Sequence, residues 1–333
     1  MLEPTNDILN NQFSSSTIRG NQRLYVIKIG GNIIDDEAKL SSFLQLFASL
    51  FTPHQSERTP LEGMGAKAIL IHGGGKLATK LAAQLGVEQQ LIDGRRITDA
   101  ETLKIVTMVY AGYINKNIVA QLQAHGCNAI GLCGADGNII QAHKRPPVYP
   151  KPFKEELPGH SNEKSAAEQD EKQDNKLTSP PLGDGGIDYG FVGDVDLVNA
   201  TLLKSLLDQN VNVVLAPITH DKKGVLLNTN ADTIAQEIAQ AMSHLYEVHL
   251  IYSFEKAGVL FDANDDATVI PSITPTSYTD LKEKKLIFAG MIPKLDNAFT
   301  ALHKGVHRVV IGKAEELEGL VEGVAGTSIN LAE

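Results

Sequence analysis

Apolar, β-branched runs alternate with stretches of helical periodicity along most of the chain. The runs predict strands at Tyr25–Ile29, Ala68–His72, Ala129–Leu132, Val211–Ala216, Val248–Tyr252 and Arg308–Ile311. The helical pattern favours helices near residues 36–50, 76–86, 99–124, 200–209, 231–244, 276–284 and 294–304. Repeated strand-then-helix order predicts an α/β fold, a three-layer αβα sandwich with a central, mainly parallel open sheet. Thr98 with Glu101 predicts a capping box for the third helix.

One segment interrupts this pattern. From Pro146 to Gly186 the chain is rich in Pro, Gly, Glu, Lys and Gln, with few large apolar residues after Phe153. Such a composition cannot bury enough apolar surface to offset its ordering entropy, so we expect a long disordered insertion over 146–186. The flanking stretches GNIIQAH and DYGFVGDVD look like the arms of a β-hairpin, with the insertion at its tip. A tolerated surface insertion and a regulatory or docking segment both fit this placement.

Composition and charge narrow the class of protein. The 333 residues carry a net charge of −10, which argues against a nucleic-acid partner or an anionic membrane surface. No apolar run approaches the roughly 20 residues of a membrane span. The N-terminal stretch, residues 1–22, is polar and has no apolar signal region, so we expect a flexible extension on a cytoplasmic protein. Cys127 and Cys133 are expected to be buried core thiols rather than redox or metal groups.

Two predicted strands run directly into glycines. In LYVIKIGGNIID, residues 24–35, Lys28 stands near the strand end and Gly30-Gly31 follow. In AILIHGGGK, residues 68–76, the strand runs into Gly73-Gly74-Gly75 and then into a helix. Strand, glycine turn and helix start together favour an anion, because free backbone N–H groups and the helix dipole face it. Ligands of open α/β sheets bind at the carboxyl ends of the strands, so we expect a phosphate ligand here.

Three other motifs share features with the glycine run. Gly73–Ala78 fits the loose dinucleotide pattern G-x-G-x-x-G/A, but Asp93 lies in the turn IDGRR rather than at a strand end. HGGG also resembles an oxyanion-hole loop of α/β-hydrolases, but the chain has no G-x-S-x-G turn. A Walker A loop is excluded because Leu77 follows Gly75-Lys76 and the upstream glycine spacing is missing.

A set of motifs in fixed order is more specific than any of these. KIGG and HGGG are followed by DGRRITD at 93–99, GLCGADG at 131–137, LNTNADTIA at 227–235 and GMIPKLDNA at 290–298. The set resembles the amino acid kinase family, from about residue 24 to residue 312. KIGG is shared widely among kinases of carbamate, aspartate, glutamate and UMP. The GRRIT turn with N-x-N-A-D and GM-I-x-K is typical of the acylglutamate kinases of arginine biosynthesis.

The resemblance implies transfer of the ATP γ-phosphoryl group, with Mg²⁺, to the side-chain carboxylate of an N-acetyl- or N-succinyl-glutamate. This small-molecule acceptor is already an anion at neutral pH, so catalysis should rest on alignment and charge neutralisation rather than on a base. By resemblance, Lys28 and Lys294 contact the phosphoryl group from opposite sides, and Asp232 orients both lysines. Capping of a helix is the alternative role for Asp232. A carbamate or glutamate kinase, or a non-catalytic nucleotide-binding regulator, stays open as an alternative function.

The resemblance also assigns the acceptor contacts. Arg96 matches the arginine that binds the carboxylate of the substrate, and a guanidinium fork suits that contact. Its neighbour Arg95 is expected to be exposed. Asn228 and Asn230 match residues that hold the amino-acid moiety, although both could simply form turns.

Backbone groups of the two glycine runs complete the implied site. Gly30, Gly31 and Gly73 are expected to bind the ATP phosphates. Gly74 and Gly75 should lie near both the acceptor and the transferring phosphoryl group.

The nucleotide contacts are the least specific part of the resemblance. Glu255 and Gly258 in FEKAG stand where relatives have S-D-V-x-G, so we expect them near the nucleotide. We nominate no protein ligand for Mg²⁺, which should be held by phosphates and water. The acidic pairs Asp35-Asp36 and Asp265-Asp266 are expected to be solvated turn or cap residues.

The resemblance finally implies an organisation of the chain. Residues 23–218 should form an N-terminal lobe for acylglutamate binding and dimerisation, and residues 219–333 a C-terminal lobe for ATP. We expect a homodimer with the helix 99–124 at its two-fold interface. The N-terminal and C-terminal segments are poor matches to arginine-sensitive relatives, so we expect no feedback inhibition by arginine.

A hairpin lid should cover the acyl group. Its arms lie near 138–142 and 188–195, and the predicted insertion hangs from it. His143, Lys144 and Arg145 lie beside it and are candidates for the extra carboxylate of a succinyl group. A solvated basic turn is the alternative for these three residues.

Overall fold

The structure, a computed structural model, describes residues 22–52, 66–92, 95–149, 186–262, 264–284, 286–287 and 291–332. The predicted N-terminal extension, apart from its last residue, lies outside these residues. So do Asp93 and positions 150–185 of the predicted insertion.

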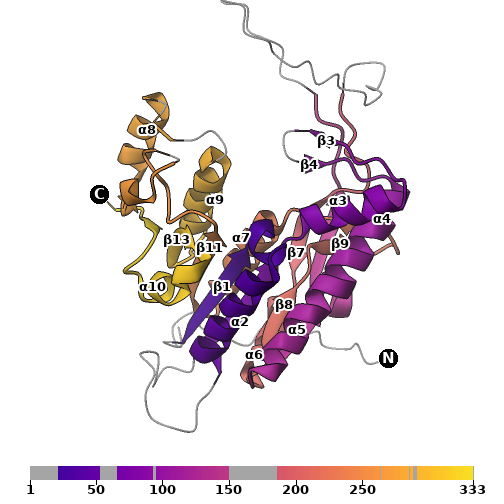
Figure 1. Cartoon of the computed structure of the whole chain (residues 1–333), viewed down its shortest axis with the longest axis horizontal. Helices are drawn as coiled ribbons and strands as arrows, with labels where there is room; N and C mark the ends of the chain where they lie inside the picture. Colours follow the sequence, from indigo (N-terminus) through magenta and orange to yellow (C-terminus); the bar gives the residue numbers. More distant parts are fainter. Residues whose placement is uncertain are drawn as a thin grey trace, which may run out of the picture.

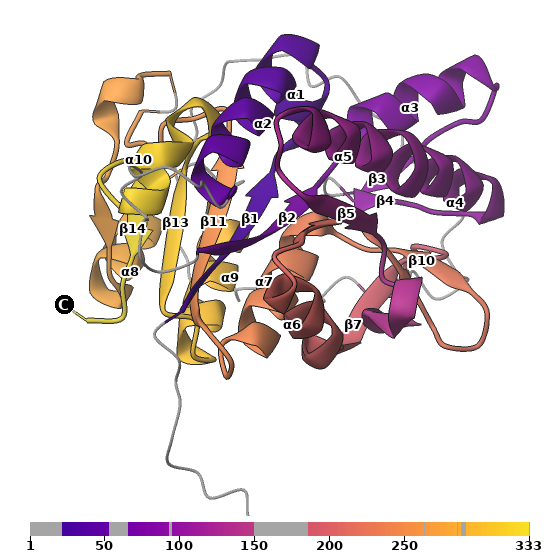
Figure 2. The ribbon, with the colours of Figure 1, turned by 90° about the horizontal axis from the view of Figure 1, so that it is seen from below.

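An eight-stranded sheet forms the middle layer, with strand order β12-β14-β13-β11-β1-β2-β8-β5 (Figures 1 and 2). Its strands are β1 (Arg23–Ile29), β2 (Lys67–His72), β5 (Ala129–Leu132), β8 (Asn212–Leu215), β11 (Glu247–Phe254), β12 (Ser272–Ile273), β13 (Arg308–Lys313) and β14 (Thr327–Ile329). All neighbours from β13 to β5 are parallel, and β14 is antiparallel to β13. The predicted mainly parallel sheet and its six strands are confirmed.

The helices fall where the apolar period predicts them, with two short additions, α1 and α10. The α-helices are α1 (Gly31–Ile34), α2 (Glu37–Phe51), α3 (Gly75–Gln84), α4 (Ala100–Thr107), α5 (Asn115–Ala124), α6 (Ala200–Asp208), α7 (Ala231–Met242), α8 (Pro275–Glu283), α9 (Ile292–His303) and α10 (Leu317–Glu322). Short 3₁₀ turns are η2 (Asp136–Asn138), η3 (Asp266–Thr268) and η5 (Ala314–Glu316). The predicted helix 99–124 is continuous but contains a π-helical segment, η1 (Met108–Ile114), between α4 and α5.

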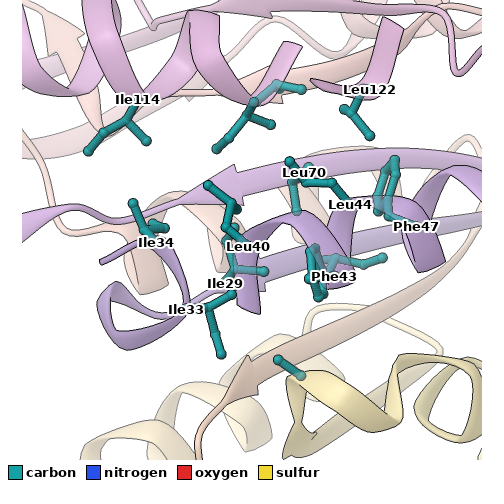
Figure 3. Packing of buried hydrophobic residues seen from close by; sticks show 14 of the residues in the cluster. Ile29, Ile33, Ile34, Leu40, Phe43, Leu44, Phe47, Leu70, Ile114 and Leu122 are labelled. Atoms are coloured by element: carbon teal, nitrogen blue, oxygen red, sulfur yellow. The ribbon is translucent and has the colours of Figure 1, made fainter. Parts of the chain in front are cut away.

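Helices cover both faces of the sheet, which gives three layers and two apolar cores (Figure 2). On β1, Tyr25, Ile27 and Ile29 face the core formed with α2 and α5, part of which is drawn in Figure 3. Leu24 and Val26 face the opposite core, formed with α6, α7 and α9. Because side chains alternate along a strand, Lys28 points to the same side as Leu24 and Val26, toward α7.

A second, four-stranded sheet carries the predicted lid, in the order β10-β9-β6-β7. Its strands are β6 (Ile140–Lys144), β7 (Gly193–Val198), β9 (Ile218–His220) and β10 (Leu226–Asn228). The antiparallel pairing of β6 with β7 confirms the predicted hairpin. Val148 and Ile187 exchange two backbone hydrogen bonds of 2.9 and 2.8 Å, which close the hairpin just before the segment 150–185. A small hairpin, β3 (Leu91–Ile92) with β4 (Arg95–Arg96), lies apart from both sheets.

The predicted capping box at Thr98 is wrong. The helix begins one residue later than the box requires, and Asp99 caps it by accepting a 2.7 Å hydrogen bond from the backbone N–H of Thr102. Thr98 is instead held extended by a bridge to Gly190, and its hydroxyl accepts from the amide of Asn228 at 3.0 Å. A tertiary contact therefore overrides the local pattern at this position.

The cysteines are free thiols. Cys127 is buried beside Asn212, whose amide donates to its Sγ at 3.3 Å, as expected for a core thiol. Cys133, which follows β5, is only half-buried. Burial raises the pKa of both thiols. Within the described parts of the chain, no helix has the length and apolarity to cross a membrane.

Candidate active site

The two glycine turns meet at the carboxyl edge of the main sheet. Lys28 and Ile29 of β1 lie in register with Ile71 and His72 of β2, so the glycines after each strand come together. A cavity of about 380 Å³ opens over them. Of the residues predicted for the site, the cavity wall contains Lys28, Gly31, Gly73, Gly74, Gly75, Arg96, Asn228, Asn230 and Asp232. Gly30, Glu255, Gly258 and Lys294 lie outside the wall.

Two ammonium groups converge on one carboxylate at this edge. Lys28 Nζ lies 2.7 Å from Asp232 Oδ1, and Lys294 Nζ lies 2.9 Å from Asp232 Oδ2. Lys28 reaches it because its side chain points to the α7 side of β1, and Asp232 stands in the first turn of α7. Lys294 comes from the first turn of α9, the helix packed beside α7. The three side chains are between 13% and 26% exposed, so water screens them only in part.

The carboxylate of Asp232 stays ionised. Burial alone would raise its pKa, but the charges of Lys28 and Lys294 outweigh burial and hold the pKa well below its usual range. A carboxylate that is ionised at neutral pH and paired with two ammonium groups can fix their positions. It is a poor proton acceptor because its pKa is low.

The helix cap beside this group is Asn230 rather than Asp232. The side-chain oxygen of Asn230 accepts hydrogen bonds from the backbone N–H of Asp232 at 2.8 Å and of Thr233 at 3.2 Å. The alternative of Asp232 as the cap of α7 is therefore wrong. Asn228 ends β10, and both asparagines face the cavity.

Close backbone packing explains the second glycine run. Gly74 has φ +146°, and a Cβ there would lie 2.3 Å from Cδ1 of the buried Ile114. A Cβ on Gly73 would lie 3.8 Å from the backbone N of Gly31, so the two turns are in contact. Gly75 begins α3, whose first-turn N–H groups have no partner within the helix. The N–H of Gly30, by contrast, donates to the carbonyl of Ser253 at 3.0 Å.

A buried histidine, His72, holds the backbone of the Gly73–Gly75 turn. His72 is fully buried, and its Nδ1–H donates to the carbonyl oxygen of Gly73 at 2.8 Å. Its Nε2 accepts from the amide of Asn115 at 3.3 Å, and the same amide donates to the carbonyl of Val214 at 3.1 Å. Burial lowers the pKa of His72 to about 4, so the ring is neutral at physiological pH. Sequence reasoning missed this pair, although a histidine directly before the glycines was a visible signal.

Arg96 is aimed into the cavity by several acceptors. Its Nη2 donates to the carbonyl of Gly75 and to the hydroxyl of Thr79, both at 2.9 Å. Its Nη1 donates to Gln89 Oε1. Gln89 and Thr79 were not predicted, because their role depends on contacts between β4, α3 and the loop before β3. Arg95 is exposed as expected, although it also touches the cavity mouth.

The structure separates the three basic lid residues. His143 and Lys144 are exposed and pair with Asp196 at 2.6 Å and Asp188 at 3.1 Å. The side chain of Arg145 is only 13% exposed and lines the cavity. Its Nε donates to both carboxylate oxygens of Asp194, at 3.0 and 3.2 Å, so one edge of the guanidinium is already paired.

The predicted nucleotide residues follow β11, the neighbour of β1. Glu255 is exposed and Gly258 is buried. A Cβ on Gly258 would lie 2.6 Å from the hydroxyl of Thr327, so packing against β14 explains this glycine. Since Ser253 lies in register with Ile29, Glu255 and Gly258 follow β11 at the same edge of the sheet as the glycine turns. Neither residue lines the cavity.

The acidic pairs differ from one another. Asp36 caps α2 and Asp265 caps η3, as expected for cap residues. Asp266 lies 3.5 Å from the ammonium group of Lys313. The expectation of a solvated carboxylate is wrong for Asp35, whose two oxygens are buried without a hydrogen-bond partner. Burial raises the pKa of Asp35.

The cavity wall is strongly cationic although the chain as a whole is acidic. Among the described residues, its cations are Lys28, Lys76, Arg95, Arg96 and Arg145, and its one carboxylate is Asp232. Such a wall, with helix N-termini beside it, can hold two anionic groups close together against their mutual repulsion.

Known proteins resemble this chain over most of its length. The profile of the amino acid kinase family matches residues 23–313. A protein of Cytophaga hutchinsonii named acetylglutamate kinase is 48% identical over 300 residues, which cover 90% of this chain and 95% of that protein. One of Parabacteroides distasonis with the same name is 47% identical over 296 residues, which cover 89% and 96%.

Two solved structures support the fold. N-acetylglutamate synthase from Neisseria gonorrhoeae, complexed with coenzyme A and N-acetyl-glutamate, superposes with a TM-score of 0.66 at 20% identity, covering 94% of this chain and 60% of that chain. Carbamate kinase from Giardia lamblia bound to AMP-PNP gives 0.56 at 13% identity, covering 94% and 99%. At these identities the likeness concerns the fold alone.

Proposed function

The chain belongs to the amino acid kinase family, and we propose that it transfers the γ-phosphoryl group of ATP to the side-chain carboxylate of N-acetyl-L-glutamate, a step of arginine biosynthesis. One observation carries the proposal: Lys28 and Lys294 are fixed on opposite oxygens of Asp232 beside two glycine turns. Relatives that are nearly half identical over most of the chain support the acceptor. We assign the enzyme to the cytoplasm on the ground of its use of ATP.

Transfer then needs positioning and charge neutralisation. The acceptor carboxylate attacks the γ-phosphorus, the bond from this phosphorus to the β,γ-bridging oxygen breaks and ADP leaves, so no residue has to remove a proton. Lys28 and Lys294 neutralise the charge on the transferring group, and the N–H groups of Gly31 and of the Gly73–Gly75 turn hold its oxygens. Asp232 keeps the ammonium groups in place, which lowers the reorganisation needed during reaction.

The acceptor lies on the N-terminal side of the cavity. Arg96 binds its α-carboxylate, with Gln89 and Thr79 holding the guanidinium in orientation. Asn228 and Asn230 hold the acylamino part. On this assignment residues 23–218 bind the acylglutamate together with Asn228 and Asn230, and the remainder of residues 219–333 bind ATP, with Glu255 and Gly258 on the nucleotide side.

Mg²⁺ accompanies ATP in this proposal. The residues present fit an ion held by phosphate oxygens and water, because Asp232, the one carboxylate that the described part of the chain places on the cavity wall, is paired with two ammonium groups. When bound, the ion neutralises phosphate charge.

A substrate panel tests the proposal. With ATP and Mg²⁺, we expect turnover of an acylated glutamate and none of free glutamate or carbamate, measured as ADP release in a coupled assay. Absence of turnover on both N-acetyl- and N-succinyl-glutamate would reject it. Binding of NAD in preference to ATP–Mg, measured by calorimetry, would instead support a dinucleotide-binding regulator.

N-succinyl-L-glutamate is a second candidate acceptor, favoured by Arg145 on the cavity wall. If the free edge of this guanidinium binds a succinyl carboxylate, Arg145→Gln should lower kcat/KM for the succinyl substrate about ten- to hundredfold more than for the acetyl substrate. Lys144→Gln, which removes an exposed lid cation, is the matched control and should change neither value. An equal loss on both substrates would assign Arg145 to the lid structure alone.

We also propose a homodimer, built across the long helix α4–η1–α5. Met108 and Tyr113, two large apolar side chains of this helix, are 54% and 62% exposed in the single chain, and a partner helix packed there would bury both. Light scattering should give twice the 35.9 kDa chain mass for the wild type and a smaller mass for Tyr113→Lys. Leu197→Lys, at a similarly exposed position on β7, should leave the mass unchanged. A monomeric wild type would contradict the proposal.

A further inference from the structure

A cluster of ligand-type side chains lies at the edge of the main sheet opposite the glycine turns. Glu247 begins β11, His249 follows two residues later on the same face, and His307 directly precedes β13. Because an eight-residue strand is roughly 25 Å long, the cluster is well separated from the catalytic edge.

The geometry of the cluster approaches that of a metal site. His249 Nε2 lies 3.0 Å from Glu247 Oε1, and His307 Nε2 lies 3.7 Å from the same oxygen. All three ligand atoms lie within 4.8 Å of one another. In a tetrahedral site with bonds of about 2.1 Å, ligand atoms are about 3.4 Å apart, so the two separations measured from Glu247 Oε1 bracket the required value. Among the residues that the structure describes, no other group of three such side chains converges in this way.

Burial divides the three ligands into fixed and adjustable ones. His249 is 7% exposed and packs between the rings of Tyr25 and His307, so its orientation is set by the fold. The side chain of Glu247 is 28% exposed. His307, at 57%, is free to move the short distance that closes the site.

A guanidinium group competes for the same oxygen. Arg23 Nε lies 3.1 Å from Glu247 Oε1, and Arg308 lies in the same surface pocket. A bound cation would have to displace Arg23, whose side chain is 37% exposed and can turn into water. This competition predicts that removal of Arg23 strengthens the site, whereas removal of any ligand weakens it.

We propose that Glu247, His249 and His307 bind a divalent transition-metal ion with nitrogen and oxygen ligands, of the class of Zn²⁺ or Co²⁺. Two imidazole nitrogens favour these ions over Mg²⁺ or Ca²⁺. Water completes the coordination, since the described residues supply three ligands. The ion joins the first residues of β11 and β13 and stabilises the sheet, without taking part in phosphoryl transfer.

Metal titration of the tag-free full chain tests the site. Calorimetry with Zn²⁺ should give one ion per chain, and Co²⁺ should produce the intense visible absorption of a tetrahedral ion. His249→Gln, His307→Gln and Glu247→Gln should each weaken Zn²⁺ binding at least about tenfold. Arg23→Gln should strengthen it. His125→Gln, an exposed histidine on another part of the surface, is the control and should change nothing.

His307→Gln keeps the test valid if the more buried variants fail to fold, because His307 is exposed. Zn²⁺ should raise the Tm of the wild type and not of this variant, since only a folded site binds the ion. Zn²⁺ affinity that is equal in the wild type and His307→Gln, or a weak octahedral Co²⁺ spectrum, would overturn the proposal. So would an Arg23→Gln variant that binds Zn²⁺ no more tightly than the wild type.

Discussion

Replacement of Lys28 or Lys294 by alanine is expected to lower kcat about a hundred- to thousandfold and to change ATP–Mg affinity only severalfold. Both ammonium groups are held on one carboxylate, at 2.7 and 2.9 Å, so they are aimed at the same region at the carboxyl edge of the sheet. Positive charge at this position stabilises the transition state of phosphoryl transfer more than it stabilises bound ATP. Steady-state kinetics gives kcat, and calorimetry of ATP–Mg gives the affinity.

Two further variants separate charge from placement. Lys28→Arg keeps the charge but changes its shape, and should recover only part of the lost turnover. Lys80→Ala removes an exposed lysine of α3 and should leave kcat near the wild-type value. Near-normal turnover in Lys28→Ala or Lys294→Ala would contradict the role given to that lysine.

Asp232→Asn is expected to lower both turnover and stability. The neutral amide leaves two partly buried ammonium groups without a counter-charge, and loss of one partner of such a pair costs about 3 kcal/mol of unfolding free energy. Because the lysines then lose their fixed positions, kcat should also fall by at least about a hundredfold. Urea unfolding and steady-state kinetics measure the two effects.

The stability difference should also depend on pH. The pKa of Asp232 is lower in the folded chain than in the unfolded chain, where it is about 3.9. Its contribution is therefore complete above that value and is lost as the pH falls toward the folded pKa. The gap in unfolding free energy between wild type and Asp232→Asn should be constant from pH 7 to pH 5 and narrow below pH 4.

Asp208 provides a matched comparison. It too pairs with two lysines, Lys67 at 2.8 Å and Lys204, and these hydrogen bonds lower its pKa to about 2. Its side chain is 44% exposed, so Asp208→Asn should cost less than about 1 kcal/mol and leave kcat unchanged. An equal loss of unfolding free energy in Asp232→Asn and Asp208→Asn would show that burial does not make the ion pairs of Asp232 more stabilising than those of Asp208.

The main strands were predictable because they are buried on both faces. Val26, Leu70 and Val214 belong to continuous apolar runs, which is the pattern of a parallel sheet under two helical layers. The short strand β14, with the sequence Thr-Ser-Ile, carries no such pattern and was missed. At Thr98 the local capping motif was present, but pairing with Gly190 decided the conformation.

The site was predictable only in part. The alternation along β1 and the glycines after it place Lys28 at the carboxyl edge, but no periodicity brings Lys294 to the same carboxylate. That convergence was inferred from the family motifs, and it depends on the packing of α9 against α7. Gln89 and His72 were missed because each acts through a contact with a residue distant in sequence. Arg145 could not be distinguished from its two basic neighbours until the lid was folded.

Because Val148 and Ile187 pair through their backbones, we expect the hairpin of β6 and β7 to tolerate changes at its tip. Opposed residues of an antiparallel pair are only about 5.5 Å apart, so any chain that joins them leaves and returns at nearly one point. The register of β6 with β7 is then set by their own pairing, independently of the segment that joins Val148 to Ile187. A reporter domain whose ends lie close together can therefore be grafted at this point without shifting the register of β6 with β7.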